Sequence, residues 1–160
     1  MKNTVTIRKG VKNDLPRVLE LVKELAAFER APDEVTNTLA QMEEDGFGRN
    51  PAFGFFVAER ADFIVGLSLY YYRYSTWRGR RLYLEDIIVT EKERGSGIGK
   101  RLFNITMQFA LDENCTGMEW QVLDWNEPAI TFYKKYGSKL DGEWINCSLD
   151  RDQIESILQG

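Results

Sequence analysis

The chain has 160 residues, of which 43% are hydrophobic and 29% charged, and its formal net charge is −4. This composition is typical of a globular protein that buries its own core, and we expect one domain over residues 1–160. No apolar run reaches the roughly 18 residues of a membrane span, and the N-terminus lacks the apolar segment of a signal peptide. We therefore expect a cytoplasmic protein with no membrane partner, and the negative charge argues against nucleic acid as a partner.

The rarity of two residue types limits the possible chemistry. The sequence has no histidine, which excludes the usual Ser-His-Asp and Cys-His nucleophilic machinery. Its two cysteines, Cys115 and Cys147, lack metal-ligand spacing, so we expect no metal site and interpret both as small apolar residues. Proton transfer must then depend on carboxylates, tyrosine, lysine or water.

The first half of the chain predicts strands around one long helix. Residues 4–9 alternate as a strand, and a helical stripe from Leu15 to Ala26 follows, capped by Asn13 or Asp14. A loop at 29–34 precedes a short helix that Thr36 could cap and that ends before Gly46. Three strands follow, with a turn at Ala61–Asp62 between the first two, and they span residues 53–59, 63–74 and 81–89.

The second half alternates helices with strands. A glycine-rich turn opens a helix with Ile98, Leu102, Ile105 and Phe109 on one face, and a strand is expected at 118–125. Asn126 is expected to cap a helix that ends at Gly137, followed by a strand at 143–149 and a terminal helix that starts near Asp150. The order of elements predicts a mixed α/β sheet with helices on its faces.

The glycine-rich turn runs from Arg94 to Lys100 and reads RGSGIGK. A strand, a turn and a helix in this order direct free backbone N–H groups and the positive end of the helix toward an anion, and phosphate is the expected one. A Walker loop is excluded because Arg94 stands where its first glycine belongs. A dinucleotide fingerprint is excluded because Lys100 stands where its third glycine belongs.

The pattern that does fit is Arg-x-x-Gly-x-Gly, filled by Arg94, Gly97 and Gly99. It closely resembles the pyrophosphate-binding signature of the Gcn5-related N-acetyltransferases (GNAT). Further blocks resemble the spermidine/spermine (diamine) and thialysine acetyltransferases in family order: KELAAFE (23–29), EDGFG (44–48), YSTWRGR (74–80), LYLED (82–86) and LDWNEPAITFYKKYG (123–137). The resemblance implies the GNAT fold, an α/β (α+β type) fold with a mixed central sheet, splayed central strands and helices on both faces.

The resemblance also implies acetyl-CoA as co-substrate. Its pantetheine arm would lie between the splayed strands 84–89 and 120–125, bound like an added strand. The residues expected to hold it are Ile87, Ile88, Val89, Arg94, Gly95, Ser96, Gly97, Ile98, Gly99, Lys100, Asn126 and Lys135.

The reaction implied is direct acetyl transfer to a primary amine. Because an alkylammonium has a pKa of about 10.4, it must lose a proton before it attacks. Glu85 is the expected base, directly or through water, and Asp86 is expected to help hold the cation. Strand alternation places these two side chains on opposite faces unless a bulge intervenes. Tyr133 matches the family's general acid, with Tyr136 as the competing candidate.

The amine site implied by the resemblance contains Phe28, Glu29, Trp77, Glu85, Asp86 and Trp144. Two departures weaken the case for a long polyamine. Phe28 lacks the hydroxyl of the family's tyrosine, and Ser75 stands where polyamine enzymes carry an acid. The YSTW form resembles the thialysine branch instead, so a small polyamine, a diamine or a lysine-like amine all stay open.

Several further alternatives stay open. The acidic residues concentrated between Glu29 and Asp45 form either a solvated face or one wall of a channel for cations. Acetylation of a protein or peptide, and a non-catalytic coenzyme A-binding sensor, are the competing functions. The resemblance also implies a homodimer.

Overall fold

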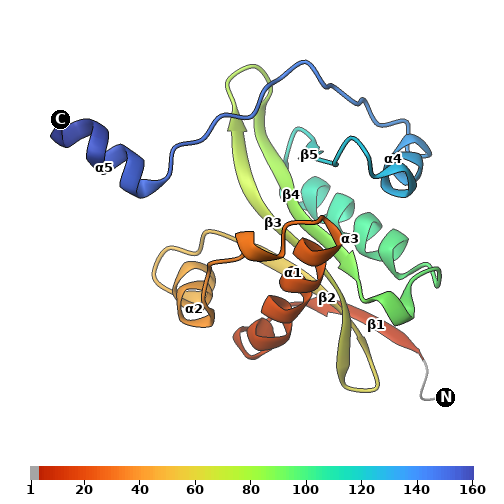
Figure 1. Cartoon of the computed structure of the whole chain (residues 1–160). Helices are drawn as coiled ribbons and strands as arrows, with labels where there is room; N and C mark the ends of the chain where they lie inside the picture. Colours follow the sequence, from red (N-terminus) through yellow and green to blue (C-terminus); the bar gives the residue numbers. More distant parts are fainter. Residues whose placement is uncertain (1–3) are drawn as a thin grey trace. The chain divides into compact units, whose positions relative to one another are not determined.

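The structure is a computed structural model that describes residues 4–160 (Figure 1). It divides into two compact units, Met1–Gln121 and Val122–Gly160. The expectation of one domain over 1–160 stays a prediction.

The first unit contains a five-stranded sheet in the order β1-β2-β3-β4-β5. Neighbouring strands are antiparallel except β4 and β5, which are parallel. The strands are β1 (Val5–Lys9), β2 (Gly54–Arg60), β3 (Phe63–Ser75), β4 (Gly79–Val89) and β5 (Met118–Trp120). The helices are α1 (Leu15–Phe28), α2 (Leu39–Phe47) and α3 (Ile98–Asp112), with 3-10 turns at Lys12–Asp14, Pro32–Glu34 and Glu91–Glu93.

The helices cover both faces of this sheet (Figure 1). Phe55 and Val57 of β2 pack in one core with the apolar faces of α1 and α2. Phe56 and Ala58, which alternate with them, pack in a second core with α3. The mixed sheet with helices on both faces confirms the predicted fold class.

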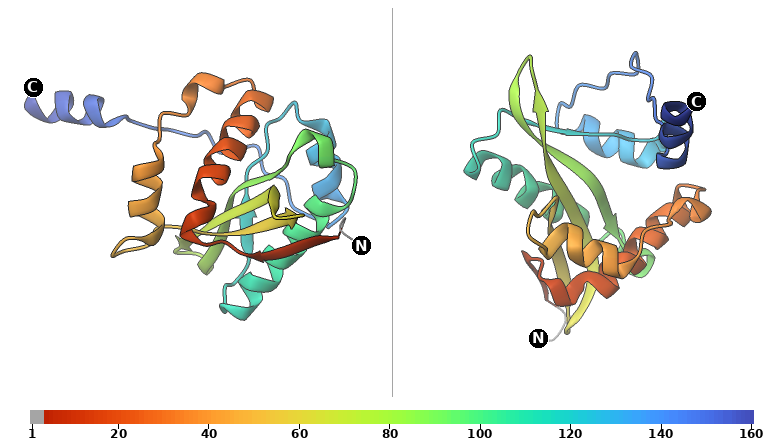
Figure 2. Two further views of the ribbon diagram at one scale, coloured as in Figure 1. Left: turned by 90° about the horizontal axis from the view of Figure 1, so that it is seen from below. Right: turned by 90° about the vertical axis from the view of Figure 1, so that its left-hand side faces the viewer.

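The long β3–β4 hairpin extends beyond the helices that flank the sheet (Figure 2). The shorter hairpin of β2 and β3 turns at Ala61 and Asp62, as predicted, and both residues have positive φ angles of 50° and 63°. The helix that Thr36 is expected to cap begins at Leu39 instead, and it runs through Gly46 to Phe47 rather than ending before Gly46. Thr38 is its cap, because the Thr38 hydroxyl oxygen accepts a hydrogen bond from the Gln41 N–H at 3.1 Å.

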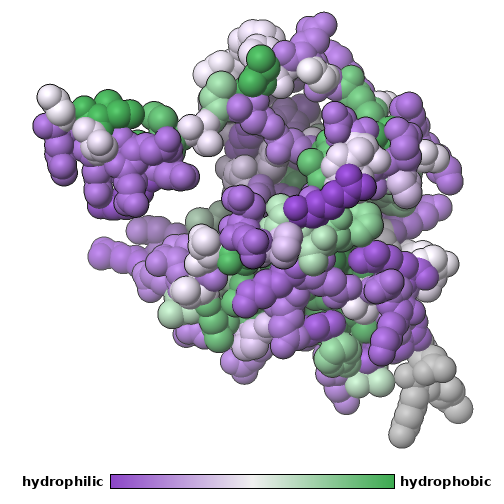
Figure 3. Space-filling view, in the orientation of Figure 1, coloured by the Kyte–Doolittle hydropathy of each residue, from purple (hydrophilic) through white to green (hydrophobic). Residues whose placement is uncertain are grey.

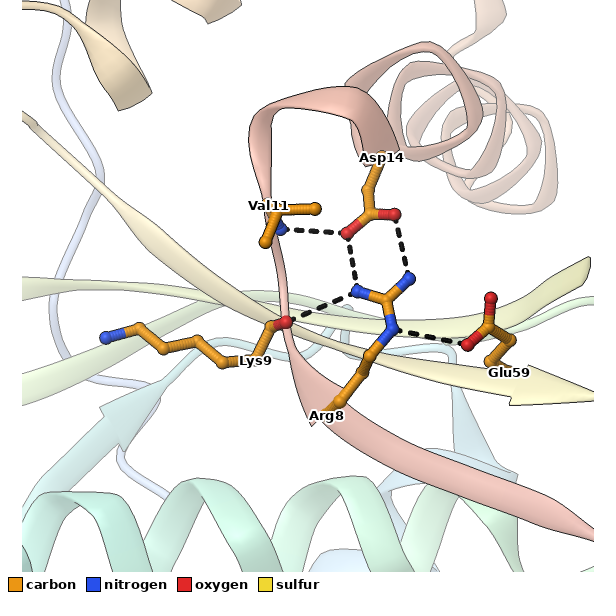
Figure 4. Close-up of polar contacts among 5 residues, drawn as sticks. All are labelled: Arg8, Lys9, Val11, Asp14 and Glu59. Atoms are coloured by element: carbon orange, nitrogen blue, oxygen red, sulfur yellow. Dashed lines mark hydrogen bonds and ion pairs between the residues drawn. The ribbon is translucent and has the colours of Figure 1, made fainter. Parts of the chain in front are cut away.

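A network around Arg8 joins β1, β2 and the start of α1 (Figure 4). The Arg8 guanidinium donates to both carboxylate oxygens of Asp14, at 2.8 and 2.9 Å, and to Glu59 at 3.2 Å. The Val11 N–H donates to Asp14 as well, at 2.8 Å. Asp14 is only 8% exposed, so its charge depends on these donors.

We expect Asp14→Asn to destabilise the fold by about 1–3 kcal/mol at pH 7. Hydrogen bonding to Arg8 lowers the pKa of Asp14, so the stability that the carboxylate contributes is present above its unfolded-state pKa and is lost as pH falls through the folded-state pKa. The destabilisation caused by Asp14→Asn should therefore shrink as pH falls below about 4. Urea unfolding at several pH values measures it. Glu20→Gln, in the exposed Arg17–Glu20 pair, is the control and should change stability little. A cost for Asp14→Asn that stays constant down to pH 2 would contradict the assignment.

The second unit contains α4 (Glu127–Lys134) and α5 (Arg151–Gln159). Asn126 caps α4 as predicted, because the Ala129 N–H donates to its side-chain oxygen at 3.3 Å. The helix stops at Lys134, three residues before Gly137, whose φ of 72° belongs to the turn that follows. Helix α5 exposes an apolar stripe that includes Ile157 and Leu158, which are 63% and 80% exposed (Figure 3).

Two strand predictions are wrong. The strand expected at 118–125 ends at Trp120, and residues 143–149 form no strand. The residue pattern of 143–149 favours a strand, but a strand also needs a ladder partner, and none within residues 4–160 pairs with this segment. Its side chains Trp144 and Ile145 are 75% and 86% exposed.

Candidate active site

A β-bulge at Glu85 determines how the candidate site is built. Leu69 of β3 lies opposite Asp86 of β4, and the next residue, Tyr70, lies opposite Leu84, so Glu85 is an extra residue on β4. A bulge interrupts the alternation of side chains. Glu85 and Asp86 therefore both line one cavity on the α1–α2 side of the sheet, instead of facing opposite sides.

The cavity has a volume of about 480 Å³, a size typical of small-molecule sites. Its walls are largely aliphatic and aromatic, and its polar groups are carboxylates, an amide and a phenol. The lining residues are Leu19, Val22, Val35, Asn37, Met42, Asp45, Ala52, Phe53, Leu69, Tyr71, Glu85 and Asp86. Because lysine and arginine are absent from this lining, the cavity suits a molecule with an alkyl body and a cationic end.

The electrostatics of the cavity also favour a cation. Burial raises the pKa of Asp86 to about 7, and the negative charges of Glu85 and Glu29 add to the effect. Burial, and then the charge of Glu85, also raises the pKa of Glu29, which is the C-cap of α1. The carboxylates of Glu29, Glu85 and Asp86 thus repel one another in a partly desolvated environment, and a bound ammonium would relieve that repulsion.

The structure brings together three of the predicted amine-site residues, Glu29, Glu85 and Asp86. Phe28 lies beside them at the end of α1, with the Arg94 guanidinium 5.2 Å from its ring centroid. Trp77 lies at the tip of the β3–β4 hairpin, is 83% exposed and does not line the cavity. Its role stays a prediction.

Sequence reasoning missed two polar residues of the lining, Asn37 and Tyr71, and left the role of Asp45 open. Asp45 belongs to the acidic concentration that was interpreted as either a solvated face or a channel wall, and it contributes to a wall. Tyr71 could have been found by alternation from Leu69. No pattern in the sequence indicates Asn37.

The edge of β4 beyond the bulge is open toward β5. The two strands pair from Leu82↔Met118 to Leu84↔Trp120, and within residues 4–160 no strand pairs with β4 on that side beyond Leu84. The side chain of Ile88 packs in the core below α1, whereas those of Ile87 and Val89 pack toward α3. Only backbone groups of this segment are therefore suited to bind an extended ligand.

The glycine turn has the conformation that an anion site requires. Gly95 and Gly97 have φ angles of 81° and 83°, a region that favours glycine. Gly97 is the N-cap of α3 and supplies no side-chain cap, so the first N–H groups of the helix are not capped by a side chain. Ser96 donates to the Glu93 carbonyl at 2.6 Å, which stabilises the turn. These residues fit the phosphate groups of coenzyme A.

Not every predicted residue of the turn is equally placed for a ligand. Ile98 is 2% exposed, so its side chain belongs to the core and only its N–H faces the turn. Gly99 lies next to the Val89 side chain, and Lys100 is exposed. Arg94 is directed toward α1, where its side chain contacts Glu24 and Phe28.

The remaining predicted site residues belong to the unit Val122–Gly160. Tyr133 is 6% exposed and its ring makes an edge-to-face contact with Phe132. Burial raises the pKa of the competing tyrosine, Tyr136. Asn126 is the cap of α4, Lys135 is exposed at the end of that helix, and Trp144 lies in the irregular segment that follows. The predicted roles of these residues stay predictions.

Comparison with known proteins identifies the relatives. The model of the acetyltransferase (GNAT) family matches residues 16–137. Thialysine N-epsilon-acetyltransferase of Sus scrofa is 39% identical over 85% of each chain. Spermidine/spermine N(1)-acetyltransferase-like protein 1 of Homo sapiens is 38% identical over 82% of this chain and 20% of its own length. The structure of a possible acetyltransferase from Clostridium difficile 630 superposes with a TM-score of 0.78 at 23% identity, over 92% of this chain and 99% of that one.

Within residues 4–160, no helix combines the length and the apolar character needed to cross a bilayer. The same residues hold no group of three or more Cys, Asp or Glu side chains arranged to bind a metal ion.

Proposed function

Because this chain belongs to the acetyltransferase (GNAT) family, we propose that it transfers acetyl from acetyl-CoA directly to the primary amine of a small aliphatic cation. The observation that carries the proposal is the cavity. The bulge at Glu85 places two adjacent carboxylates in its lining, and the rest of the lining is largely aliphatic and aromatic. The names of the relatives, which concern thialysine and polyamines, agree with a substrate of this kind.

In the proposed reaction, Glu29, Glu85 and Asp86 bind the substrate as an ammonium. Glu85 then accepts one of its protons, directly or through a water molecule, and the free amine attacks the thioester carbonyl. A C–N bond forms and the C–S bond breaks. Tyr133 gives a proton to the departing thiolate, and the substrate nitrogen loses its second proton as the amide forms, which restores the Tyr133 phenol directly or through water. The products are the acetylated amine and coenzyme A.

In the first unit, the co-substrate is proposed to contact the glycine turn and the open edge of β4. The N–H groups of Gly95–Lys100 would hold the pyrophosphate, and backbone groups of Ile87, Ile88 and Val89 would pair with the pantetheine arm. The uncapped start of α3 and the open edge of β4 support this placement. Asn126 and Lys135 complete the proposed set.

Among amines, we favour a lysine-like molecule or a short diamine over a long polyamine. Ser75 lies at the end of β3 and Trp77 at the exposed hairpin tip. Because neither side chain is a carboxylate, neither can form an ion pair with the distant amine of a long polyamine. Asp45, on the α2 side of the cavity, is available for a second cationic group of a short substrate.

The test is a thiol-release screen of spermidine, spermine, putrescine, lysine and thialysine with acetyl-CoA. We expect turnover with at least one of the shorter amines. A parallel panel of peptides addresses protein acetylation, and turnover confined to peptides would contradict the proposal. Binding of acetyl-CoA without thiol release across both panels would favour the sensor instead.

The base assignment predicts a change in pH dependence. Glu85→Gln should lower kcat/KM about 10²-fold near neutral pH and move the pH optimum upward, because the amine must then lose its proton to solvent. Steady-state rates from pH 6 to 10 measure this. Glu44→Gln, an exposed acid outside the cavity lining, serves as the control. An unchanged pH profile would refute Glu85 as the base.

A homodimer in the cytoplasm completes the proposal. The exposed Trp144 and Ile145 and the apolar stripe of α5 support an additional copy, since these side chains are uncovered in the single chain. Light scattering should give twice the 18.6 kDa mass of the chain, and a monomer would contradict the dimer.

A further inference from the structure

The side chain of Arg94 makes three contacts, one with β4 and two with α1. Its Nε donates to the Val89 carbonyl at 2.9 Å, and its Nη2 lies 3.8 Å from the Glu24 carboxylate. Its guanidinium carbon lies 5.2 Å from the centroid of the Phe28 ring, within the range of a cation–π contact. The first residue of the glycine turn is thus in contact with the C-terminal half of α1.

Glu24 strengthens the same connection. Its carboxylate accepts hydrogen bonds from the Thr90 hydroxyl, at 3.0 and 3.1 Å, and from the Glu91 N–H at 3.0 Å. Both donors lie between the end of β4 and Arg94. One side chain of α1 therefore holds the segment that leads into the turn, in addition to its ion pair with Arg94.

The end of α1 also belongs to the amine half of the site. Phe28 is the last residue of the helix, and Glu29, its C-cap, interacts electrostatically with Glu85 and Asp86. Phe28, which contacts Arg94, and Glu29, which interacts electrostatically with the cavity carboxylates, are therefore consecutive in the chain.

We propose that Arg94 is a positioning residue that holds the glycine turn against α1, so that the affinity of the turn for the phosphate groups of coenzyme A depends on Phe28 and Glu24. The part of this inference that concerns the binding of coenzyme A rests on the proposed function. It gives Phe28, predicted as a residue of the amine site, a role in forming the cofactor site.

A different role for Arg94 makes different predictions. If the guanidinium acts as an independent phosphate ligand, Arg94→Ala weakens coenzyme A binding whereas Phe28→Leu does not. If Arg94 acts through its contacts with α1, both substitutions weaken binding and their effects are not additive.

The experiment is a double-mutant cycle on Phe28 and Arg94 with coenzyme A as the probe in isothermal titration calorimetry. We expect Phe28→Leu to raise the Kd about twofold to fivefold, the effect of losing a partly exposed cation–π contact. Phe28→Tyr keeps the aromatic face, so its Kd should stay within about twofold of the wild-type value. In an Arg94→Lys background, Phe28→Leu should raise the Kd for coenzyme A much less than it does in the wild type. The same background also serves if Arg94→Ala does not fold.

Hydrogen exchange in the protein without ligand provides a second measurement. Phe28→Leu and Glu24→Gln should each speed the exchange of the backbone amides of 94–100, and Phe28→Tyr should not. Additive effects in the cycle, or unchanged exchange in the turn, would overturn the inference. If the wild-type protein does not bind coenzyme A, the proposed function fails, and the exchange measurement alone decides the role of Arg94.

Discussion

Replacing Asp86 with asparagine should make the protein more stable at pH 8 and a much poorer enzyme. At that pH the native Asp86 is a carboxylate in a partly desolvated place beside Glu85 and Glu29. An asparagine of nearly the same shape removes this unfavourable charge. Because the pKa of Asp86 is raised from 3.8 to about 7, we expect a gain of about 1–3 kcal/mol in the free energy of unfolding.

The gain should depend on pH in one direction only. A carboxyl group whose pKa is higher in the folded state than in the unfolded state lowers stability most at pH values above the folded pKa. As pH falls through about 7, the folded protein takes up the proton and the cost decreases. It disappears near pH 4, where the unfolded chain is protonated as well. The stability curves of wild type and Asp86→Asn should therefore converge toward acid pH.

The same substitution should lower kcat/KM for the preferred amine about thirtyfold to hundredfold, because a charge-assisted contact with the ammonium is lost. Urea unfolding at pH 4, 6 and 8 and steady-state kinetics measure the two effects. Asp45→Asn is a matched control in the same cavity and should give no comparable gain in stability. A loss of stability at pH 8 on Asp86→Asn would show that the carboxylate is well paired, contrary to the repulsion among the three acids.

Much of this fold follows from local patterns. The stripe from Leu15 to Ala26 and the glycine-opened helix both form as predicted, because each helix buries one face against the sheet. The Ala61–Asp62 turn and the Asn126 cap depend on a few neighbouring residues, and both are confirmed. In each case the interactions that stabilise the element lie within the element or along its own apolar face.

The features that local patterns did not decide concern interactions between distant segments. The bulge at Glu85 is a matter of register between β3 and β4, and the residues around it carry no signal for it. The segment 143–149 has the residues of a strand, but its pairing depends on a partner that the sequence does not identify. The sequence predicts a site as a set of motif residues, whereas the cavity, with Asn37 and Tyr71 in its lining, required the packing of α1 and α2 on the sheet.

Replacing Tyr133 with phenylalanine should lower kcat about 10²-fold and leave the Kd for coenzyme A within twofold. The phenol is proposed to act when charge develops on the departing sulfur, and general acid catalysis typically contributes 10² to 10⁴ in rate. The substitution keeps the ring, which is 6% exposed and packs against Phe132, so the fold should tolerate it. Tyr136→Phe is the matched control, because Tyr136 lies three residues later and its ring also contacts Phe132.

The ratio of the two kinetic effects decides the role of Tyr133. A group that acts only in the transition state lowers kcat and kcat/KM equally, whereas a group that binds substrate raises KM and leaves kcat unchanged. A phenol of pKa about 10 donates to the thiolate of a thiol of pKa about 8.5 slightly uphill, so its contribution depends on placement more than on acidity. Thiol-release kinetics at saturating and limiting amine should therefore show equal losses for Tyr133→Phe and none for Tyr136→Phe. If Tyr136→Phe carries the loss instead, the acid is Tyr136, which lies two residues after α4 and whose pKa is raised by burial.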